Sequence, residues 1–388
     1  MTGVHVKIKP AIINWVFEHI PSDNVSPDIV DTLETWKEGS VQPTFNQVKT
    51  ISHKLHIPLG YFFLNSPPKE ELPLLEYRTI DSVAADPPSR NLVDTIGYAE
   101  NVQDWMRNYL IDAGSDAQPF VGSAKGIRSA DLLADLMRKN MHLEIDWYTA
   151  CTDPADSFNV IRKKLESIGI LILMNGIVGT NSHRKLDINE FRAFTLIDDY
   201  APLIFINRND SDGARLFSLL HEAVHIWLGV ASFYNERPDN TASINDVEQL
   251  CNAVTAEILV PNQTFKEKWN LYRQELPQKD VVEKLTVLFK CGITVIARRA
   301  LDNNYINAVQ YQEIVTIAIN NYNKQRKMRK SGGGDFYRTA ISRFDTRFLL
   351  ALDNSIKERK TQYTDAYRLT GLNRTSFANL LDKVRGGT

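Results

Sequence analysis

The chain has 388 residues, of which 43% are hydrophobic and 24% charged, a composition typical of globular proteins. It excludes a mostly disordered or fibrous chain. The three cysteines are odd in number and widely spaced, which argues against a disulfide framework or a cysteine-based zinc knuckle. No apolar run approaches the roughly 20 residues of a membrane helix, and the N-terminus lacks a signal-peptide core, so we expect a soluble, cytoplasmic protein without membrane contact.

The charge is distributed unevenly along the chain, although the formal net charge is only −2. Residues 324–388 hold 15 Lys and Arg against 6 Asp and Glu, and the remaining residues hold 30 against 41. This pattern predicts either that the basic tail meets an acidic partner, nucleic acid or protein, or that it is a solvated linker and helix surface. The sequence leaves both readings open.

The first third of the chain reads as helical. Apolar residues recur at three- and four-residue spacing within 1–66, where Ser26-Pro27 marks a helix start, Gly39 ends that helix and Pro43-Thr44 opens the next. Residues 67–89 are rich in proline and acidic residues and predict an extended linker. Amphipathic helices are expected at 90–113 and 128–140.

The pattern changes to strands in the middle of the chain. Residues 166–176, 191–198 and 201–207 are short runs of Ile, Leu and Phe bounded by turn residues, which predicts a small sheet. A helix over 214–230, a polar loop over 231–245 and a helix over 246–261 follow, and 276–323 is again helical. A charged, glycine-rich hinge at 324–336 precedes a last unit, in which 361–385 predicts two helices that turn at Gly371. That pair is either a small helix-turn-helix that binds nucleic acid or two helices that pack together. For the whole chain, the pattern predicts an α+β fold that is mostly helical.

The strongest chemical signal is an H-E-x-x-H motif, His221-Glu222-Ala223-Val224-His225. Residues four apart share one face of a helix, so both imidazoles can bind one metal ion. Glu222 lies about a hundred degrees round the helix, where it can act as a general base rather than as a ligand. The motif therefore predicts a metal-assisted hydrolase site.

A zinc ion at this site needs a third protein ligand and an open fourth position. Glu248 in the next helix, 23 residues after His225, is the preferred candidate. Asn252, one turn further on the same face, is expected to hydrogen-bond a ligating histidine. Glu257 competes for the ligand position, but it lies about 180 degrees from Glu248, so both cannot face one ion.

Two further parts of the predicted site are less defined. Tyr234, Arg237 and His183 are candidates for stabilising the oxyanion of peptide hydrolysis. The strand at 201–207 leads into the motif helix, and if it lies at a sheet edge, an extended substrate could pair with it. The three cysteines are expected to be inert core thiols.

These residues resemble the ImmA/IrrE-type zinc metallo-endopeptidases fused to an N-terminal Xre-like helix-turn-helix domain. The resemblance rests on WKEGSVQPTFNQV, IPLGYFFLNSPP, EYRT, PLIFINRNDSDGARLFSLLHEAVH and EQLCNAVTAEILVP, and it continues in SGGGDFYRTAISRF. By similarity, His221, His225 and Glu248 match the ligands of Zn²⁺ and Glu222 matches the catalytic base. The family usually has Ala where this chain has Cys251.

The resemblance implies a domain order and a cellular role. It predicts an Xre-like domain at 1–68, a linker and helical segment at 69–127, a zincin-like peptidase domain at 128–275, a helical segment at 276–330 and a basic helical domain at 331–388. Such proteins cleave or antagonise helix-turn-helix repressors that control mobile elements, prophage genes or stress responses. Others are encoded beside toxin genes and resemble antitoxins or toxin regulators. A non-proteolytic antitoxin-like regulator that binds a toxin partner and DNA is the alternative, and a homodimer stays open.

The N-terminal module is not expected to bind DNA by itself. Between Ser26 and Trp36 there is room for one helix, whereas a DNA-reading unit needs a helix, a turn and a recognition helix. Residues 1–60 also carry five Lys and Arg against six Asp and Glu, and a DNA-binding face normally has a basic excess. A degenerate module for protein contact or dimerisation is predicted instead.

Overall fold

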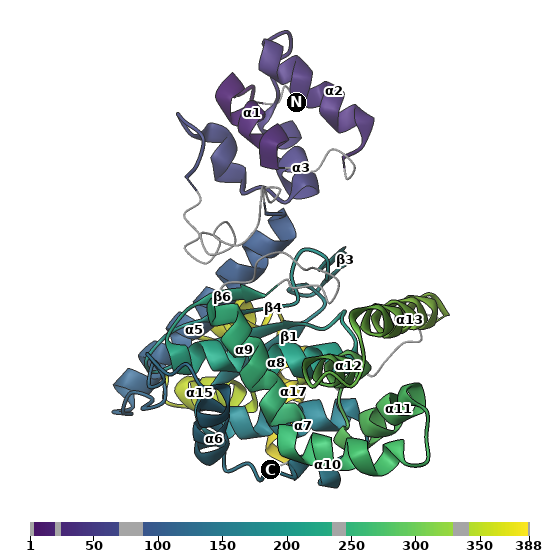
Figure 1. Ribbon diagram of the computed structural model, residues 1–388. Coiled ribbons are helices and arrows are strands. Elements are labelled where there is room, and N and C mark those ends of the chain that lie inside the picture. Colours follow the sequence, from purple (N-terminus) through teal and green to yellow (C-terminus); the bar gives the residue numbers. More distant parts are fainter. Residues whose placement is uncertain (1–3, 20–24, 70–87, 235–245, 329–340, 387–388) are drawn as a thin grey trace. The chain divides into compact units, whose positions relative to one another are not determined.

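The computed structural model describes residues 4–19, 25–69, 88–234, 246–328 and 341–386 (Figure 1). The chain divides into two compact units, Met1–Gly97 and Tyr98–Thr388. In the described residues the protein is mostly helical with a small sheet, which confirms the fold class that the sequence pattern predicts. None of the helices in these ranges is both long enough and apolar enough to cross a membrane.

The first unit has its own apolar core. Its helices are α1 (Pro10–His19), α2 (Pro27–Glu38), α3 (Phe45–Leu55) and the 3-10 helix η2 (Leu59–Phe63). Ile12, Leu33, Val48 and Phe62 are among the side chains that fill the space between these elements. A single helix, α2, therefore spans Ser26 to Trp36, as expected from the short interval between them.

The predicted caps of this unit are present. Ser26 occupies the N-cap position of α2 without a side-chain capping hydrogen bond, Pro27 is the first helical residue, and Gly39 ends the helix with φ 73°, in the left-handed region that glycine adopts most easily. Thr44 begins α3 with a capping box, in which its side chain accepts from the Gln47 backbone and the Gln47 side chain accepts from the Thr44 backbone. The start of α3 is thus fixed by a capping box, and that of α2 by the proline at its first position.

A four-stranded sheet forms the centre of the second unit, with the order β1-β5-β4-β6. Its strands are β1 (Leu171–Asn175), β4 (Ala193–Leu196), β5 (Leu203–Asn207) and β6 (Ser232–Tyr234). β1 lies parallel to β5, whereas β4 lies antiparallel to both β5 and β6. A two-stranded ribbon pairs β2 (Ile177–Val178) with β3 (Asn181–Lys185).

The strand at 203–207 is not a sheet edge, which corrects the expectation that a substrate could pair with it. β5 is hydrogen-bonded to β1 on one side and to β4 on the other, so its backbone groups are already used. Its side chains are all buried, as is usual for a strand covered on both faces. The sequence pattern of a buried run does not distinguish a central strand from an edge strand.

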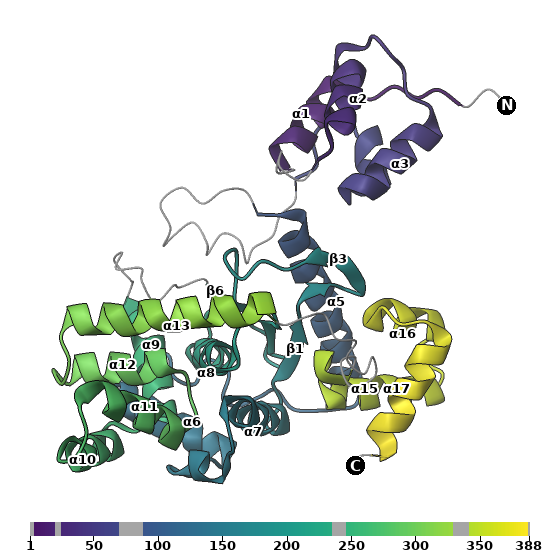
Figure 2. The same ribbon diagram turned by 90° about the vertical axis from the view of Figure 1, so that its right-hand side faces the viewer.

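Helix α8 (Asp212–Leu228) lies against this sheet and carries the H-E-x-x-H motif (Figure 1 and Figure 2). The Ser211 side chain accepts a hydrogen bond from the Ala214 backbone at its start, and Gly229 ends it with φ 68°. Helices α7 (Pro154–Ser167) and α9 (Asp246–Leu259) pack against α8, and β4 and β5 contact it from the sheet. This surrounding packing makes α8 the buried central helix of the unit.

The remaining elements surround this centre. They are α5 (Arg90–Asp112), which begins in the first unit, α6 (Ala130–Met141), η3 (Trp147–Ala150), α10 (Asn262–Arg273), α11 (Gln278–Phe289), α12 (Ile293–Asp302), α13 (Ala308–Met328), α15 (Thr346–Lys357), α16 (Tyr363–Thr370) and α17 (Arg374–Gly386). The two helices predicted within 361–385 are present as α16 and α17, and Gly371 lies between them with φ 67°.

Some sequence predictions fall on residues outside the described ranges. These are most of the linker at 67–89, the second part of the loop at 231–245 and most of the hinge at 324–336. The first residues of that predicted hinge belong instead to α13, which continues to Met328. Helices α7 and α10, the β2–β3 ribbon and β6 are not among the elements that the sequence predicts.

Candidate metal centre

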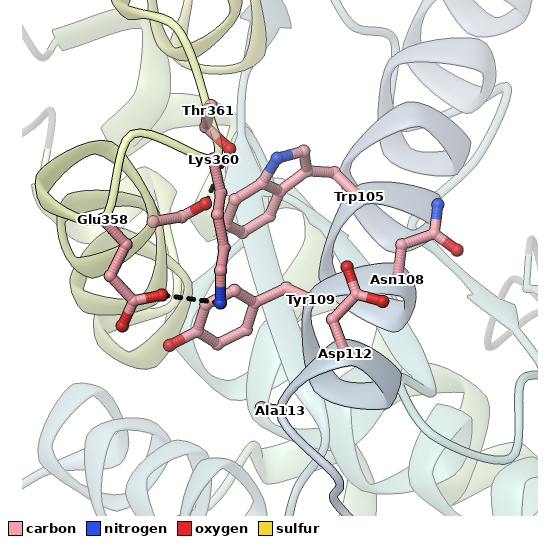
Figure 3. A pocket seen from close by; sticks show the side chains of 9 residues that line it. Trp105, Asn108, Tyr109, Asp112, Ala113, Glu358, Lys360 and Thr361 are labelled. Carbon is pink, nitrogen blue, oxygen red and sulfur yellow. Dashed lines mark hydrogen bonds and ion pairs between the residues drawn. The ribbon is translucent and has the colours of Figure 1, made fainter.

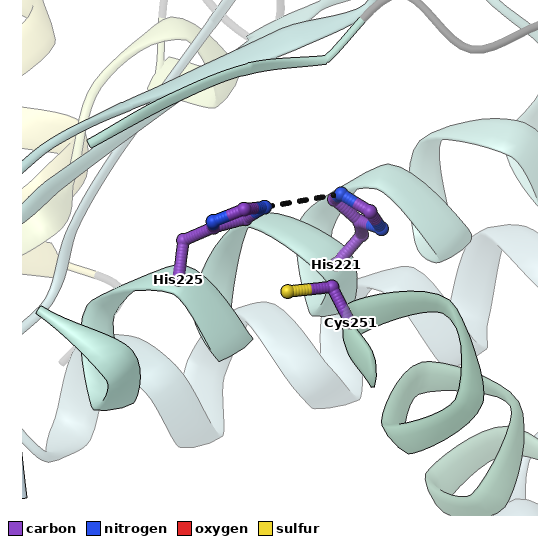
Figure 4. A group of neighbouring side chains, drawn as sticks. All are labelled: His221, His225 and Cys251. Atoms are coloured by element: carbon purple, nitrogen blue, oxygen red, sulfur yellow. Dashed lines mark hydrogen bonds between the residues drawn. The ribbon is translucent and has the colours of Figure 1, made fainter. Parts of the chain in front are cut away.

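Helix α8 brings its two motif histidines together at its buried face. His221 is fully buried and His225 is 1% exposed, and their Nε2 atoms lie 3.2 Å apart (Figure 4). The four-residue spacing stacks the two rings on one side of the helix. Both imidazoles can therefore direct a nitrogen to one point.

Glu248 reaches the same point from α9. Its Oε2 lies 3.0 Å from Nε2 of His221, and its Oε1 lies 3.4 Å from Nε2 of His225. Burial opposes the charge of this carboxylate, but hydrogen bonds to His221 and His225 outweigh it and hold the pKa of Glu248 well below its ordinary value. Glu248 is thus charged beside the two imidazoles.

The donor set fits a divalent metal ion such as zinc. Two imidazole nitrogens and a carboxylate are typical zinc ligands, and bonds of 2.0–2.1 Å in a tetrahedral site place donors about 3.3 Å from each other. The observed separations between these donors are 3.0, 3.2 and 3.4 Å. Buried imidazole nitrogens that face each other this closely also need a shared proton or a cation to stabilise them.

Asn252 supports one of the two histidines. Its Oδ1 lies 3.0 Å from Nδ1 of His221, so the amide oxygen can accept a hydrogen bond from the ring. With the proton on Nδ1, the Nε2 of His221 keeps its lone pair for a metal ion. The Nδ1 of His225 has no hydrogen-bond partner in the described part of the chain.

Glu222 is buried beside these groups, and its two carboxylate oxygens have different surroundings. Its Oε2 accepts hydrogen bonds from the Thr195 hydroxyl, at 2.5 Å, and from the Ser232 hydroxyl. Thr195 and Ser232 are register partners on β4 and β6, so their side chains leave the sheet on the same face. Its Oε1 has no partner among the described residues. One oxygen is held and the other is available for proton transfer.

The thiol of Cys251 is a further possible metal donor beside the two histidines. The Cys251 sulfur and one nitrogen from each of His221 and His225 all lie within 4.8 Å of one another. Burial, and then the carboxylates of Glu248 and Glu222, raise the pKa of this thiol well above its ordinary value. The expectation of an inert core thiol suits Cys151 and Cys291, but Cys251 lies against the metal centre.

Sequence reasoning missed three residues of this centre, namely Thr195, Ser232 and Cys251. Cys251 had a usable signal, because three residues after Glu248 it falls on the same face of the helix. Thr195 and Ser232 had none, since their meeting depends on the pairing of two strands, one of which has only three residues.

The other candidates lie elsewhere or outside the described side chains. Glu257 pairs with Arg299, with Oε2 and Nη2 2.5 Å apart. His183 is exposed on β3. The Tyr234 side chain and Arg237 are not among the described parts, so an oxyanion-stabilising role for them stays a prediction, as do the roles of His221, Glu222, His225, Glu248 and Asn252.

The comparisons with known proteins agree with this class of site. A buried H-E-x-x-H helix with a carboxylate from the next helix is an arrangement typical of metallopeptidases. Residues 166–301 match the family model of the IrrE N-terminal-like domain of peptidase family M78, which supports an ImmA/IrrE-type, metallopeptidase-like function for this part. Residues 344–383 match a domain of unknown function, DUF8813. No curated protein and no solved structure matches the chain.

A separate cavity of about 280 Å³ lies where α5 faces the end of α15 and the turn that follows it (Figure 3). It is lined by Trp105, Asn108, Tyr109, Asp112, Ala113, Ser355, Glu358, Lys360 and Thr361. Lys360 and Glu358 form an ion pair at its rim, 2.8 Å apart. None of its lining residues belongs to the metal centre.

Proposed function

We propose that this protein is a zinc-dependent endopeptidase that acts on a regulatory protein. His221, His225 and Glu248 would hold the ion, and Glu222 would act as the general base. The observation that carries the proposal is the pairing of a three-donor cluster with the buried carboxylate of Glu222, one oxygen of which has no hydrogen-bond partner among the residues that the structure describes. A structural zinc site needs no such carboxylate.

The protein side chains divide the work of hydrolysis. When bound, zinc lowers the pKa of water and polarises a peptide carbonyl. The Oε1 of Glu222 takes a proton from the attacking water and delivers it to the nitrogen of the leaving amine. Thr195 and Ser232 keep the other oxygen in place, so the carboxylate does not rotate between these two transfers.

The substrate class follows from the resemblance of the sequence to ImmA/IrrE-type proteins fused to Xre-like modules. We infer that the substrate is a repressor or an antitoxin-like protein encoded near this one, in a mobile-element, stress or toxin-antitoxin system. The N-terminal unit would supply a protein-contact surface rather than a DNA-reading helix.

The test combines metal analysis with cleavage of partner proteins. Purified full-length protein should hold one zinc per chain, and incubation with proteins encoded by neighbouring genes should produce a defined cleavage. Glu222→Gln keeps the size and hydrogen-bonding oxygen of the side chain but removes the base, so it should retain zinc and lose cleavage. Glu257→Gln makes the same chemical change in the Arg299 ion pair and should retain both.

Two outcomes would contradict the proposal. Equal cleavage by wild type and Glu222→Gln would exclude the assigned base. Tight binding of a neighbouring protein without cleavage by either form would favour the alternative, a non-proteolytic antitoxin-like regulator.

A further inference from the structure

Cys251 lies at the edge of the apolar core, against the metal centre. Its side chain is fully buried and lies beside the two histidine side chains (Figure 4). The sulfur and a nitrogen of each ring lie within 4.8 Å of one another. These three atoms come from two different helices, α8 and α9.

The other two thiols have different neighbours. The Cys151 sulfur lies 3.9 Å from the Trp147 backbone oxygen, and the Cys291 sulfur lies 3.8 Å from the Gly292 backbone oxygen. Both are ordinary contacts of a thiol in a protein core. Cys251 is the one of the three that joins a group of metal-binding side chains in the described structure.

We propose that Cys251 is a further ligand of the metal ion, an inference that rests on the metal centre of the proposed function. On binding, the S–H bond breaks, the proton leaves to solvent and a sulfur–metal bond forms, without any change of oxidation state. The donor set then has two imidazoles, one carboxylate and one thiolate. All are residues of this chain.

The sulfur is within reach of that position. Around one tetrahedral zinc ion, a sulfur at 2.3 Å and a nitrogen at 2.0–2.1 Å lie about 3.6 Å apart. In this structure the sulfur and the two nitrogens lie within 4.8 Å of one another. The sulfur therefore has to move by about 1 Å at most to reach the separation of a tetrahedral site. Cys251 follows Glu248 by three residues, so the two side chains lie on neighbouring parts of one face of α9.

The extra donor has two consequences for the site. Four protein ligands would complete a tetrahedral zinc site and leave no position for water, so hydrolysis would require Cys251 not to be bound. Cys251 would thus hold the enzyme in a resting form. A thiolate also favours soft ions such as Cd²⁺ over hard ions such as Mn²⁺.

The test is a titration of metal-free, full-length protein with Co²⁺. The wild type should bind one Co²⁺ per chain and develop a sulfur-to-cobalt charge-transfer band in the near ultraviolet. Cys251→Ala and Cys251→Ser should lose this band, and Cys291→Ala, a matched change in another buried thiol, should keep it. Cys251→Ala should also weaken Cd²⁺ binding at least tenfold and leave Mn²⁺ binding unchanged.

The wild-type spectrum alone can overturn the inference, so the test does not depend on the folding of a variant. One bound Co²⁺ with visible bands but no charge-transfer band would mean that Cys251 only packs beside the ion. In that case Glu222-dependent cleavage would still support the proposed function. Failure of the folded wild type to bind any Co²⁺, Cd²⁺ or Zn²⁺ would overturn both.

Discussion

The carboxylate of Glu222 is oriented by hydroxyls from two strands. Thr195 on β4 and Ser232 on β6 donate to the same oxygen, Oε2. Thr195 also contacts the Glu222 backbone oxygen, at 3.2 Å. A general base must hold its geometry through proton transfer, so we infer that both hydroxyls are positioning residues.

Removal of the Thr195 hydroxyl should therefore slow hydrolysis without releasing the metal. We expect Thr195→Val, which keeps the shape of the side chain, to lower kcat about 10- to 100-fold because the carboxylate loses one of its two donors. KM and zinc content should stay near the wild-type values. Steady-state kinetics across pH, together with metal analysis, measures both.

Thr195→Ser provides the control, since it keeps the hydroxyl and removes only a methyl group. It should recover most of the activity and the wild-type pH profile. An equally slow Thr195→Ser variant would indicate that packing, and not the hydrogen bond, is the contribution of Thr195.

Asn252 should contribute to metal affinity rather than to the chemical step. In Asn252→Leu, the His221 ring loses the acceptor 3.0 Å from its Nδ1, so the ring is no longer fixed in the metal-binding tautomer. Loss of such a supporting group typically weakens metal binding 10- to 100-fold. Competition with a zinc chelator should measure this loss of zinc affinity. The loss should be smaller in Asn252→Asp, which keeps an acceptor oxygen. Unchanged affinity in Asn252→Leu would exclude the supporting role.

The residues of the site differ in how far the sequence could predict their positions. His221 and His225 come together through the local repeat of one helix, which needs no tertiary information. The hydrogen bond of Asn252 to a histidine also follows from helix spacing once α9 is placed beside α8. The donation of Thr195 and Ser232 to Glu222 depends on strand register, which the sequence pattern does not determine at a strand of three residues.

At the scale of elements, the backbone at both ends of α8 lies very close to the backbone of neighbouring segments. Gly213, in the first turn, lies against Gly292, the residue that begins α12. A Cβ added at Gly213 would lie 2.8 Å from the Gly292 Cα, closer than real contacts allow. At the other end, the backbone N–H of Gly122 donates to the backbone oxygen of Ile226. A Cβ added at Gly229 would lie 3.0 Å from the Cα of Gly122.

Gly213→Ala should therefore destabilise the second unit, because backbone and not a flexible side chain would have to move. Overpacking of this kind costs about 1–3 kcal/mol. The expected result is a thermal midpoint of the metal-free protein lowered by several degrees, measured by circular dichroism. Gly97→Ala is the matched control: an added Cβ there meets no atom within 4 Å, and helical Ala is about 1 kcal/mol more favourable than Gly. Equal midpoints for the two variants would contradict the packing account.

The C-terminal helices depend on a buried carboxylate that joins α15 to α17. Asp353 receives hydrogen bonds from Arg385, at 2.5 and 3.0 Å, and pairs with Lys357, at 2.8 Å. Burial opposes the charge of Asp353, but these cations outweigh it and lower its pKa below the ordinary value. The stabilisation is thus present above the pKa of the unfolded chain, about 3.9, and is lost as the pH falls through the lower folded pKa.

Asp353→Asn should weaken this connection by about 1 kcal/mol, a modest value because the two cations are partly in solvent. At neutral pH, amide exchange in α17 should be roughly fivefold faster in the variant. The difference from the wild type should disappear in acid, after correction for intrinsic exchange rates. A difference that is independent of pH would contradict an ionic origin.

Most helices of the chain and the three strands β1, β4 and β5 could be predicted from the sequence, whereas β6 and the β2–β3 ribbon could not. Capping residues and the 3.6-residue repeat are local, so the boundaries of α2, α3 and α8 follow from Ser26, Thr44 and Gly229. The place of the 201–207 strand within the sheet could not be predicted, because an apolar run indicates burial but not which strands lie beside it. The β2–β3 ribbon has exposed and polar residues and carries no such run.

At the scale of the whole molecule, the metal centre belongs to one unit and one chain. His221, His225, Glu248 and Glu222 all lie within Tyr98–Thr388, and so does the apolar core that surrounds α8. The first unit has a core of its own. The account therefore requires one ion per chain, whatever the oligomeric state.

The most direct test is a crystal structure of the zinc-loaded protein with anomalous data on both sides of the zinc absorption edge. We predict one zinc peak per chain, at bonding distance from Nε2 of His221, Nε2 of His225 and a carboxylate oxygen of Glu248. A peak at another position, or a fully loaded protein in which Glu248 does not touch the ion, would contradict the account.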